Sequence, residues 1–367
     1  MRRHIWAGLD VGVETTRLCV INDEGEVLQE ATCPTTLASV DREIRWLRRR
    51  RTAAVSLEGG CGLHLARGLR SRGYAIRLYE ARQLSKFLRI RRNKTDASDA
   101  IGIAEAGRLG QTLVSTVHLK CLECQSLQSR LTIRRHLVRN RVAIVNLLCR
   151  QLENYGGRIS RSSLSPRNFR LRVQAEILKV FGRTSSALTR ELRRLLGIAE
   201  SLLTYQHMID CELDHLAKEI EVCRRFMAIP GVGTLTALTF HATICEPHRF
   251  RRTADIGAYL GLTPKLYQSG LIYRSGRISR MGSSSARHAL VAASKGFMKW
   301  STETDPLRVW VAGVEQSRGR PKARVALARK LAVVMLAMWK SGDAYRSESP
   351  APARTPDSSR TGPREAD

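Results

Sequence analysis

Four acidic residues are unusual in their surroundings or their spacing. Asp10 lies in the apolar run Ala-Gly-Leu-Asp-Val-Gly, and Glu58 has the same place in Val-Ser-Leu-Glu-Gly-Gly. Asp96 and Asp99 are three residues apart in Lys-Thr-Asp-Ala-Ser-Asp-Ala, a spacing that puts both on one face of a helix. An acid within an apolar strand is costly unless something pairs with it, so these residues are candidates for a shared site.

Carboxylates grouped in this way are suited to hard divalent cations, which prefer oxygen ligands. Two such ions about 4 Å apart can clamp the attacking and leaving oxygens of a phosphodiester. Each acid also has an ordinary explanation. Asp10 or Glu58 can cap a turn or a helix, and Asp96 or Asp99 can occupy a first helical turn that favours negative charge. The four acids together indicate a metal-dependent phosphoryl-transfer site.

The charge of the chain indicates its partner. The 367 residues include 62 Lys and Arg against 33 Asp and Glu, which gives a net charge of +29. A GC-rich genome favours Arg, but it rarely raises the pI to 10.8. We therefore expect a nucleic-acid partner. The sequence has no apolar run of ~18 residues and no signal peptide, so we expect no membrane partner and a cytoplasmic, nucleoid-associated protein.

The nine cysteines are scattered and odd in number, so reduced thiols are expected in place of a disulfide framework. Cys121 and Cys124 form a Cys-x-x-Cys pair inside a helical pattern. No second Cys or His pair lies at zinc-finger spacing to complete a tetrahedral site. Zinc binding is therefore disfavoured from the sequence, and this pair has no predicted role.

The elements that must position the four acids follow from the apolar periodicity. Strands first, and strands alternating with helices later, predict a mixed α/β sheet and not a purely parallel one. The expected strands are 5–11, 17–21, 27–31, 53–57 and 75–79, and the expected helices are 38–50, 61–71 and one that opens near Asp96 after a basic stretch.

Two long helical segments follow this sheet. Residues 116–154 contain no Pro or Gly and predict one helix of roughly 58 Å. Glycines and a Ser-rich stretch at 160–165 end it, and residues 186–226 predict a second helix. Their apolar stripes are narrow, which favours an antiparallel coiled-coil arm or a dimerisation seam. A plain helical bundle inside a larger domain is the alternative.

The C-terminal part predicts a mostly helical unit. Ile-Pro-Gly-Val-Gly at 229–233 looks like a helix-hairpin-helix turn, in which Gly231 and Gly233 would let the backbone approach a DNA phosphate. A simple connector between two helices is the alternative. Residues 322–339 predict a further helix, and the composition after Arg346 is typical of a disordered tail.

The order Asp, Glu, Asp-x-x-Asp on strand, strand and helix resembles the RuvC-like branch of the ribonuclease H fold. More narrowly, it resembles the DEDD domain of the IS110 family of transposases. Three C-terminal runs resemble the signature of that family's transposase domain: Ala-Tyr-Leu-Gly-Leu-Thr-Pro at 258–264, Tyr-Gln-Ser-Gly at 267–270, and Gly-Arg-Ile-Ser-Arg-Met-Gly at 276–282. One departure is Arg-Met-Gly-Ser-Ser-Ser at 280–285, where an Arg-Gly-Asn run is more usual.

The resemblance covers residues 5–345 and implies a domain order. It predicts a RuvC-like DEDD metal-dependent domain at 1–112 and a helical coiled-coil connector at 113–226. A transposase domain with a nucleophilic serine is expected at 227–345, followed by a disordered tail at 346–367.

The resemblance also implies the chemistry of the site. Asp10, Glu58, Asp96 and Asp99 become the expected catalytic Mg²⁺ ligands, and Ser269 becomes the nucleophile that bonds covalently to DNA. Without the family motif, Ser269 is an ordinary turn residue with local rivals. Those rivals are Ser275, Ser279, Ser283, Ser284 and Ser285. The nearby candidates for phosphate contacts are Arg274, Arg277 and Arg280.

The function that the resemblance implies is that of an insertion-sequence transposase, a site-specific recombinase of donor and target DNA. A structured noncoding (bridge) RNA would guide it. A homodimer or homotetramer is expected, in which the serine of one protomer can serve the carboxylates of another. The candidate nucleic-acid contacts on the N-terminal basic faces are Arg48, Arg49, Arg89, Arg91, Arg92 and Lys94.

Three alternatives stay open from the sequence. A RuvC-like junction-resolving endonuclease would use the carboxylates alone. An actin-like ATP-binding protein can also have Gly-x-Asp-x-Gly on its first strand, as at residues 8–12. A non-enzymatic nucleic-acid scaffold would tolerate the loss of Asp10.

Overall fold

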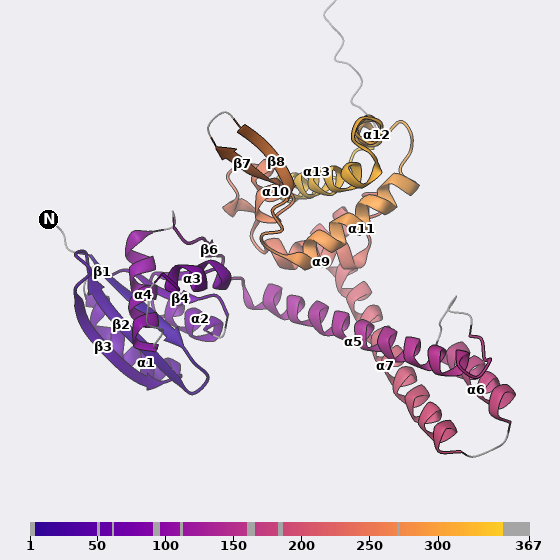
Figure 1. Ribbon diagram of the computed structural model, residues 1–367. Coiled ribbons are helices and arrows are strands. Elements are labelled where there is room, and N and C mark those ends of the chain that lie inside the picture. Colours follow the sequence, from indigo (N-terminus) through magenta and orange to yellow (C-terminus); the bar gives the residue numbers. More distant parts are fainter. Residues whose placement is uncertain are drawn as a thin grey trace, which may run out of the picture. The chain divides into compact units, whose positions relative to one another are not determined.

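The computed structural model describes residues 4–49, 52–60, 62–90, 96–110, 113–159, 166–182, 186–269 and 272–347. The chain divides into two compact units, Met1–Lys120 and Cys121–Asp367 (Figure 1). The four-part division expected from the sequence is finer than this and stays a prediction. Among the described residues, no helix combines the length and the apolar character that a membrane span requires.

The first unit is built on a six-stranded mixed sheet with the order β3-β2-β1-β4-β5-β6. Strands β1, β2 and β3 form an antiparallel meander, β4 and β5 extend it in parallel from β1, and β6 closes it antiparallel to β5. The predicted mixed sheet is thus confirmed. The strands are β1 (Ile5–Val11), β2 (Thr15–Asn22), β3 (Val27–Pro34), β4 (Thr52–Glu58), β5 (Ile76–Tyr79) and β6 (Thr116–Val117).

Helices cover both faces of this sheet. Helices α1 (Leu37–Ile44) and α2 (Leu63–Ser71) pack on the face that buries Leu9 and Leu57. Helix α4 (Asp96–Leu109) packs on the opposite face, where Ala100 and Ala104 meet Cys19 and Ile21. The sheet is therefore the middle layer of three, and the alternation of side chains along β1 decides which layer each residue faces.

The first unit differs from the sequence-based expectation in three places. The helix expected over 38–50 changes at Ile44 into a 3-10 helix, η1 (Arg45–Arg49). The basic stretch before Asp96 contains α3 (Ala81–Leu88), a short helix that was not predicted and that buries Leu84. Strand β6 was not predicted, because two residues are too few to show alternation.

The second unit begins with two long helices, α5 (Leu122–Glu153) and α7 (Ala187–Glu219). They pair antiparallel, since Arg130 bonds to Glu212 and Arg134, further along α5, bonds to Asp210. The antiparallel pairing agrees with the sequence-based expectation, whereas a coiled coil stays a prediction. The first helix begins at Leu122 and not at 116, because residues 116–117 are taken by β6.

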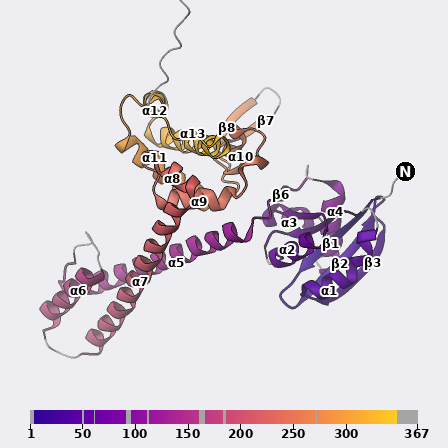
Figure 2. The same cartoon turned by 180° about the vertical axis from the view of Figure 1, so that it is seen from behind.

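Helix α6 (Pro166–Phe181) corrects the expectation of a two-helix arm. Its side chains Phe169, Val173 and Ile177 are buried against α5 and α7, so this part of the unit is a three-helix bundle. Figures 1 and 2 show α6 beside the last part of α5 and the first part of α7. Glycines and the Ser-rich stretch at 160–165 predicted an interruption, and α6 begins directly after it at Pro166, since proline is favoured in the first turn of a helix.

The remaining residues form a mostly helical body around the largest core of the chain, with Phe226, Phe240 and Phe297 among its fully buried side chains. One antiparallel hairpin, β7 (Pro264–Ser269) and β8 (Ile272–Ile278), was not predicted. The predicted helix over 322–339 is found as α13. The helices are α8 (Glu221–Met227), α9 (Thr234–Ile244), α10 (Ile256–Tyr259), α11 (Ser284–Trp300), α12 (Pro306–Arg318) and α13 (Arg320–Ser341), with 3-10 turns η2 (Pro247–Arg249) and η3 (Thr253–Asp255).

Candidate functional site

Asp10 and Glu58 each follow a leucine, and the two leucines lie opposite each other on adjacent parallel strands. Leu9 of β1 lies opposite Leu57 of β4, and both are fully buried on the α1–α2 face. Side chains alternate along a strand, so the next residues, Asp10 and Glu58, face the opposite layer, which contains α4. Asp10 is half-buried and Glu58 is exposed. The two acids therefore lie at one edge of the sheet, at the carboxyl ends of two neighbouring strands.

Gly8 determines how closely α4 approaches this edge. A Cβ at Gly8 would lie 2.3 Å from the Ala100 carbonyl oxygen and 2.3 Å from the Ala104 nitrogen. Only a residue without a side chain lets the helix backbone rest on β1 in this way. The contact fixes the height of α4 above the strand that carries Asp10.

The contacts of α4 also fix its direction. A Cβ at Gly107 would meet the side chains of Ser56 and Trp6, whereas Ala100 and Ala104 lie over Gly8. The helix therefore runs antiparallel to β1, and its first turn lies toward the strand end that carries Asp10. The rise of about 1.5 Å per helical residue and about 3.3 Å per strand residue places this turn level with Asp10.

The first turn of α4 carries the other two predicted acids. Asp96 is the first residue of the helix, and its side chain lies outside the described residues. Asp99 follows three residues later and is half-buried. The folding of the first unit thus brings three elements, β1, β4 and α4, to one open edge, each with a predicted acid. Oxygen donors on converging elements are the arrangement that a hard divalent cation requires.

Ser269 is the last residue of β7, where it pairs with Ile272 of β8. Its side chain is exposed at the end of the hairpin. Several rival serines are engaged in local structure. Ser283 caps α11 by accepting a bond from the Ala286 N–H, and the Ser284 hydroxyl lies 3.3 Å from His288 Nδ1. Ser283 is half-buried, whereas Ser284 is exposed like Ser269 and differs from it by the contact with His288; the side chain of Ser275 lies outside the described residues.

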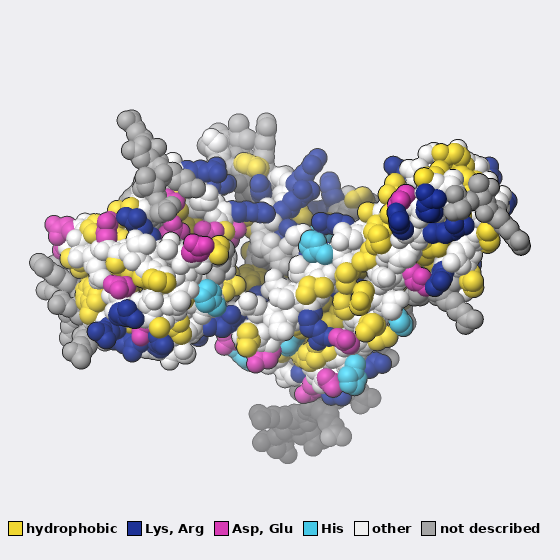
Figure 3. Space-filling view, turned by 90° about the horizontal axis from the view of Figure 1, so that it is seen from below, with side chains coloured by type: hydrophobic (Ala, Val, Ile, Leu, Met, Phe, Trp, Pro, Cys, Tyr) yellow, Lys and Arg dark blue, Asp and Glu magenta, His cyan; other side chains and the backbone are white. Residues whose placement is uncertain are grey.

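The basic residues predicted beside Ser269 lie on or just after β8. Arg277 and Arg280 are exposed, and the side chain of Arg274 lies outside the described residues. Lys and Arg side chains are scattered over the face of the molecule in Figure 3, with hydrophobic side chains exposed between them. Arg277 and Arg280 are therefore available to a polyanion.

The two predicted glycines between α8 and α9 differ in their surroundings. Gly231 has a φ of +80°, and a Cβ there would lie 2.3 Å from the Phe297 nitrogen of α11. The close packing of α11 against this turn is enough to explain why residue 231 is a glycine. Gly233 is exposed and is the N-cap residue of α9. Of the two, Gly233 keeps the geometry expected for a phosphate contact.

The predicted N-terminal basic contacts also divide into groups. Arg48 hydrogen-bonds to Asp41, and its guanidinium lies 4.9 Å from the ring centroid of Tyr74, but the residue is exposed and its nucleic-acid contact stays a prediction. Arg89 follows α3 and is exposed. The other predicted contacts lie outside the described residues. This holds for the side chain of Arg49 and for the whole of Arg91, Arg92 and Lys94.

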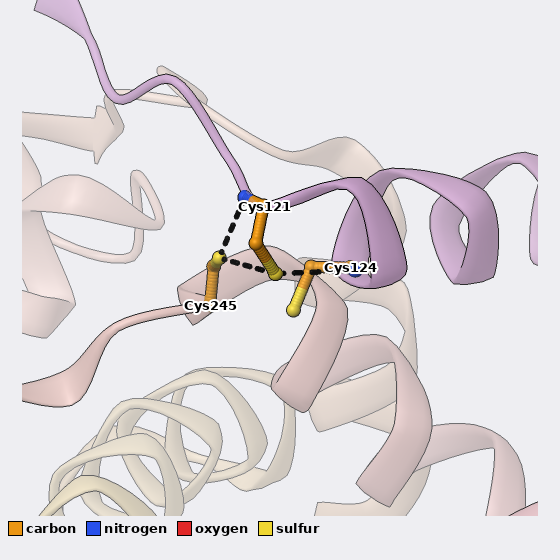
Figure 4. A group of neighbouring side chains, drawn as sticks. All are labelled: Cys121, Cys124 and Cys245. Atoms are coloured by element: carbon orange, nitrogen blue, oxygen red, sulfur yellow. Dashed lines mark hydrogen bonds between the residues drawn. The ribbon is translucent and has the colours of Figure 1, made fainter. Parts of the chain in front are cut away.

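One cluster was missed by the sequence reading. Cys245 lies next to Cys121 and Cys124 (Figure 4), although 121 residues separate it from Cys124. A spacing rule that searches for a second pair cannot find a single distant cysteine. The chemistry of this cluster is separate from the carboxylate edge and is considered below.

The mixed sheet with helices on both faces and acids at one edge is consistent with a DEDD nuclease-like domain, a class that typically uses divalent metal ions. Comparison with known proteins agrees with this class. Residues 7–156 match the family DEDD_Tnp_IS110, described as Transposase. Residues 223–306 match the Transposase IS116/IS110/IS902 family.

Curated relatives cover most of the chain. It is 28% identical over 350 residues to the transposase for insertion sequence element IS1111A of Coxiella burnetii, which covers 92% of this chain and 90% of the relative. It is 30% identical over 299 residues to the putative transposase y4pF/y4sB of Sinorhizobium fredii, covering 80% and 74%. The transposase for insertion sequence element IS1328 of Yersinia enterocolitica is 27% identical, covering 79% and 85%.

The chain therefore belongs to the IS110 family of insertion-sequence transposases. Transposases act on DNA, which agrees with the net charge of +29. This membership favours a DNA transposase over the actin-like and non-enzymatic alternatives.

Proposed function

We propose that this transposase recombines DNA by metal-assisted phosphoryl transfer at the edge formed by β1, β4 and α4. In this proposal Asp10, Glu58, Asp96 and Asp99 hold Mg²⁺, and Ser269 is the nucleophile. The close contact of α4 with Gly8 carries the proposal, because it directs the first turn of the helix toward Asp10. The donor set is made of carboxylate oxygens, which match Mg²⁺ and exclude soft-ligand metals as the preferred ion.

The proposed reaction is a transesterification. The Ser269 hydroxyl oxygen forms a bond to the phosphorus of a DNA phosphodiester, the bond from phosphorus to a deoxyribose oxygen breaks, and the hydroxyl proton passes to water. A deoxyribose hydroxyl of the second strand then attacks the same phosphorus, and the serine leaves as a hydroxyl. Bound Mg²⁺ would supply stabilisation of the charge on the phosphoryl oxygens. Arg277 and Arg280 would oppose that charge from the hairpin side.

The serine and the carboxylates belong to different units, so the proposal needs the two units to meet, and the sequence resemblance implies that they meet between protomers. We propose a homodimer or homotetramer, supported by large apolar side chains exposed on the helical pair. Ile133 of α5 is 55% exposed, and Tyr205 and Met208 of α7 are 58% and 53% exposed. Apolar side chains exposed together are frequent at protein interfaces. In sedimentation analysis, Tyr205→Asp should have a molecular mass closer to that of the monomer than the wild type has. An unchanged mass contradicts this interface.

We further propose that a structured noncoding RNA guides the reaction. The positive charge and the exposed Arg89 at the end of α3 support a backbone-binding contribution. Joining of donor to target DNA should then require RNA transcribed from the region that flanks the element. Equal joining without this RNA, or with an unrelated RNA of the same length, would contradict guidance.

The metal proposal is tested with supercoiled element DNA, the flanking RNA and Mg²⁺. Cleavage should stop in EDTA and return on addition of Mg²⁺. Asp10→Asn should remain inactive after the same addition, since it removes one oxygen ligand and one charge. Glu30→Gln is the matched control, because Glu30 is an exposed acid on β3 of the same sheet. Equal loss of activity in both variants would contradict a specific role for Asp10.

A junction-resolving endonuclease that uses the carboxylates alone is the remaining alternative. It predicts full cleavage by Ser269→Ala and no protein–DNA linkage. The proposed recombinase predicts loss of both.

A further inference from the structure

Three thiols from two distant parts of the second unit meet in one place. The sulfur atoms of Cys121, Cys124 and Cys245 all lie within 4.8 Å of one another. Cys121 Sγ and Cys245 Sγ lie 3.4 Å apart. Figure 4 shows the first two side chains at the start of α5 and Cys245 at the end of α9.

The backbone around these thiols holds the sulfurs in place. Cys121 is the N-cap residue of α5, where its sulfur accepts a hydrogen bond from the Cys124 N–H at 3.4 Å. Cys245 Sγ accepts a bond from the Cys121 N–H at 3.3 Å. Backbone N–H groups aimed at sulfur stabilise negative charge on it, as they do around metal-bound thiolates. Two of the three sulfurs therefore accept backbone hydrogen bonds of the kind that surround metal-bound sulfur.

Cys245 has a backbone conformation that cysteine rarely adopts. It ends α9 with a φ of 62° and a ψ of −52°. A side chain at positive φ is strained, and glycine or asparagine would fit a helix end of this kind more easily. The strain is offset if the sulfur takes part in a bond that glycine cannot make. Strain of this kind is a pointer to function when a chemical partner is nearby.

We propose that Cys121, Cys124 and Cys245 bind one zinc ion. Zn²⁺ bonds to thiolate sulfur at about 2.3 Å in a tetrahedral site, which sets neighbouring sulfurs roughly 3.8 Å apart. The 3.4 Å between Cys121 and Cys245 is close to that value. A disulfide requires about 2.05 Å between sulfurs. Soft thiolates select zinc over Mg²⁺, so this site and the carboxylate edge are expected to differ in the metal they bind.

The burial of the three residues indicates where a fourth ligand enters. Cys124 is buried, Cys245 is half-buried and Cys121 is exposed, so one side of the cluster is open to solvent. Glu123, between Cys121 and Cys124 in the first turn of α5, is also exposed. A water molecule or the Glu123 carboxylate would complete the tetrahedron, since zinc accepts either oxygen ligand.

The position of the cluster gives the zinc a structural role. Cys121 is the first residue of the second unit, and α5 begins directly after it. Residues Leu127 and Leu131 of the same helix belong to the core that also contains Ile244 of α9. A metal bound to all three thiols would tie the first turn of α5 to the end of α9. We therefore expect zinc to stabilise the helix that leads into the arm, without a part in phosphoryl transfer.

The proposal is tested on the full chain purified with zinc in the medium and dialysed against metal-free buffer. Mass spectrometry of metals should find about one zinc per wild-type chain, as expected for a three-thiolate site. Cys245→Ser should lose most of this zinc, and so should Cys124→Ser. Cys211→Ser is the matched control, because Cys211 is an exposed thiol on α7 outside the cluster. It should keep the zinc of the wild type.

A second measurement separates zinc loss from misfolding. Cobalt added to the metal-free wild type should give the intense near-ultraviolet absorption of sulfur-to-cobalt charge transfer, and zinc should displace it. Circular dichroism of Cys245→Ser should retain the helical signal of the wild type. Wild-type protein without zinc and without the cobalt band overturns the proposal. Zinc retained in full by Cys245→Ser, or a Cys121–Cys245 disulfide found under non-reducing digestion, overturns it as well.

Discussion

The carboxylate edge of the first unit and the Ser269 hairpin of the second place their proposed functional residues in opposite ways. The acids lie on two buried strands and a helix that rests on Gly8, so the core determines their positions. Ser269 lies at the end of a two-stranded hairpin with an exposed side chain. The difference implies that substitutions near the acids change both stability and chemistry, whereas substitution of the serine changes chemistry alone.

The largest effect is expected at Asp10. Asp10→Asn should lower the rate of DNA cleavage by roughly 10³-fold, because a metal ligand contributes several kcal/mol to the transition state. The measurement is single-turnover cleavage of element DNA with saturating protein. Glu30→Gln should cleave at the wild-type rate. Cleavage by Asp10→Asn within a few-fold of the wild type would contradict a role of the carboxylate edge in the chemistry.

The packing contact of α4 on β1 is tested by substitution of Gly8. Gly8→Ala places a methyl group against the helix backbone and should destabilise the first unit by about 1–3 kcal/mol. Gly60→Ala is the matched control, because a Cβ at Gly60 meets nothing within 4 Å. Urea unfolding should resolve the two variants. Equal unfolding midpoints would mean that α4 does not need this contact.

The helical pair of the second unit should depend on one partly buried ion pair. Burial acts to raise the pKa of Asp210, but hydrogen bonds from Arg134 and Gln206 outweigh it and hold the pKa below its usual range. Because the folded-state pKa is lowered, the stabilisation is present above the usual carboxyl pKa of about 3.9 and is lost as the pH falls through the folded value.

This ion pair is expected to contribute about 1 kcal/mol or less near neutral pH. Asp210→Asn should remove that contribution and flatten the acid limb of thermal stability between pH 5 and roughly pH 2. Asp214→Asn on the same helix is the control. An unchanged acid limb in Asp210→Asn would show that the pair adds no stability.

The smallest effect is expected for the stability of Ser269→Ala. An exposed hydroxyl at a strand end should change the free energy of unfolding by less than about 0.5 kcal/mol. Thermal unfolding of the full chain measures this. A large loss of stability would mean that the serine is part of the fold, and the contrast between the two regions would disappear.

The sequence predicted the elements that combine a strong pattern with sufficient length. Strands β1 and β4 were found because each is an apolar run with one acid, and α4 because its two aspartates have helical spacing. Helix α6 was missed because the Ser-rich stretch before Pro166 was taken for an interruption. Among the side chains of the β7–β8 hairpin that the structure describes, none is buried, so its alternation was weak.

The candidate sites differ in the same way. The two strand acids could be predicted because an acidic residue within an apolar strand is rare and therefore conspicuous in the sequence. Ser269 was identified from a family signature, and nothing in its own surroundings distinguished it in the sequence. Cys245 could not be paired with Cys121 and Cys124, because only the packing of α9 against α5 brings the three sulfurs together.

Ser269 and the carboxylates are proposed to serve one reaction, and one experiment tests this directly. Wild-type protein, Ser269→Ala and Asp10→Asn are each incubated with supercoiled element DNA, flanking RNA and Mg²⁺, and the products are separated on a denaturing gel. The account predicts a covalent protein–DNA band for the wild type and none for either variant. A covalent band of wild-type intensity in Ser269→Ala would contradict it.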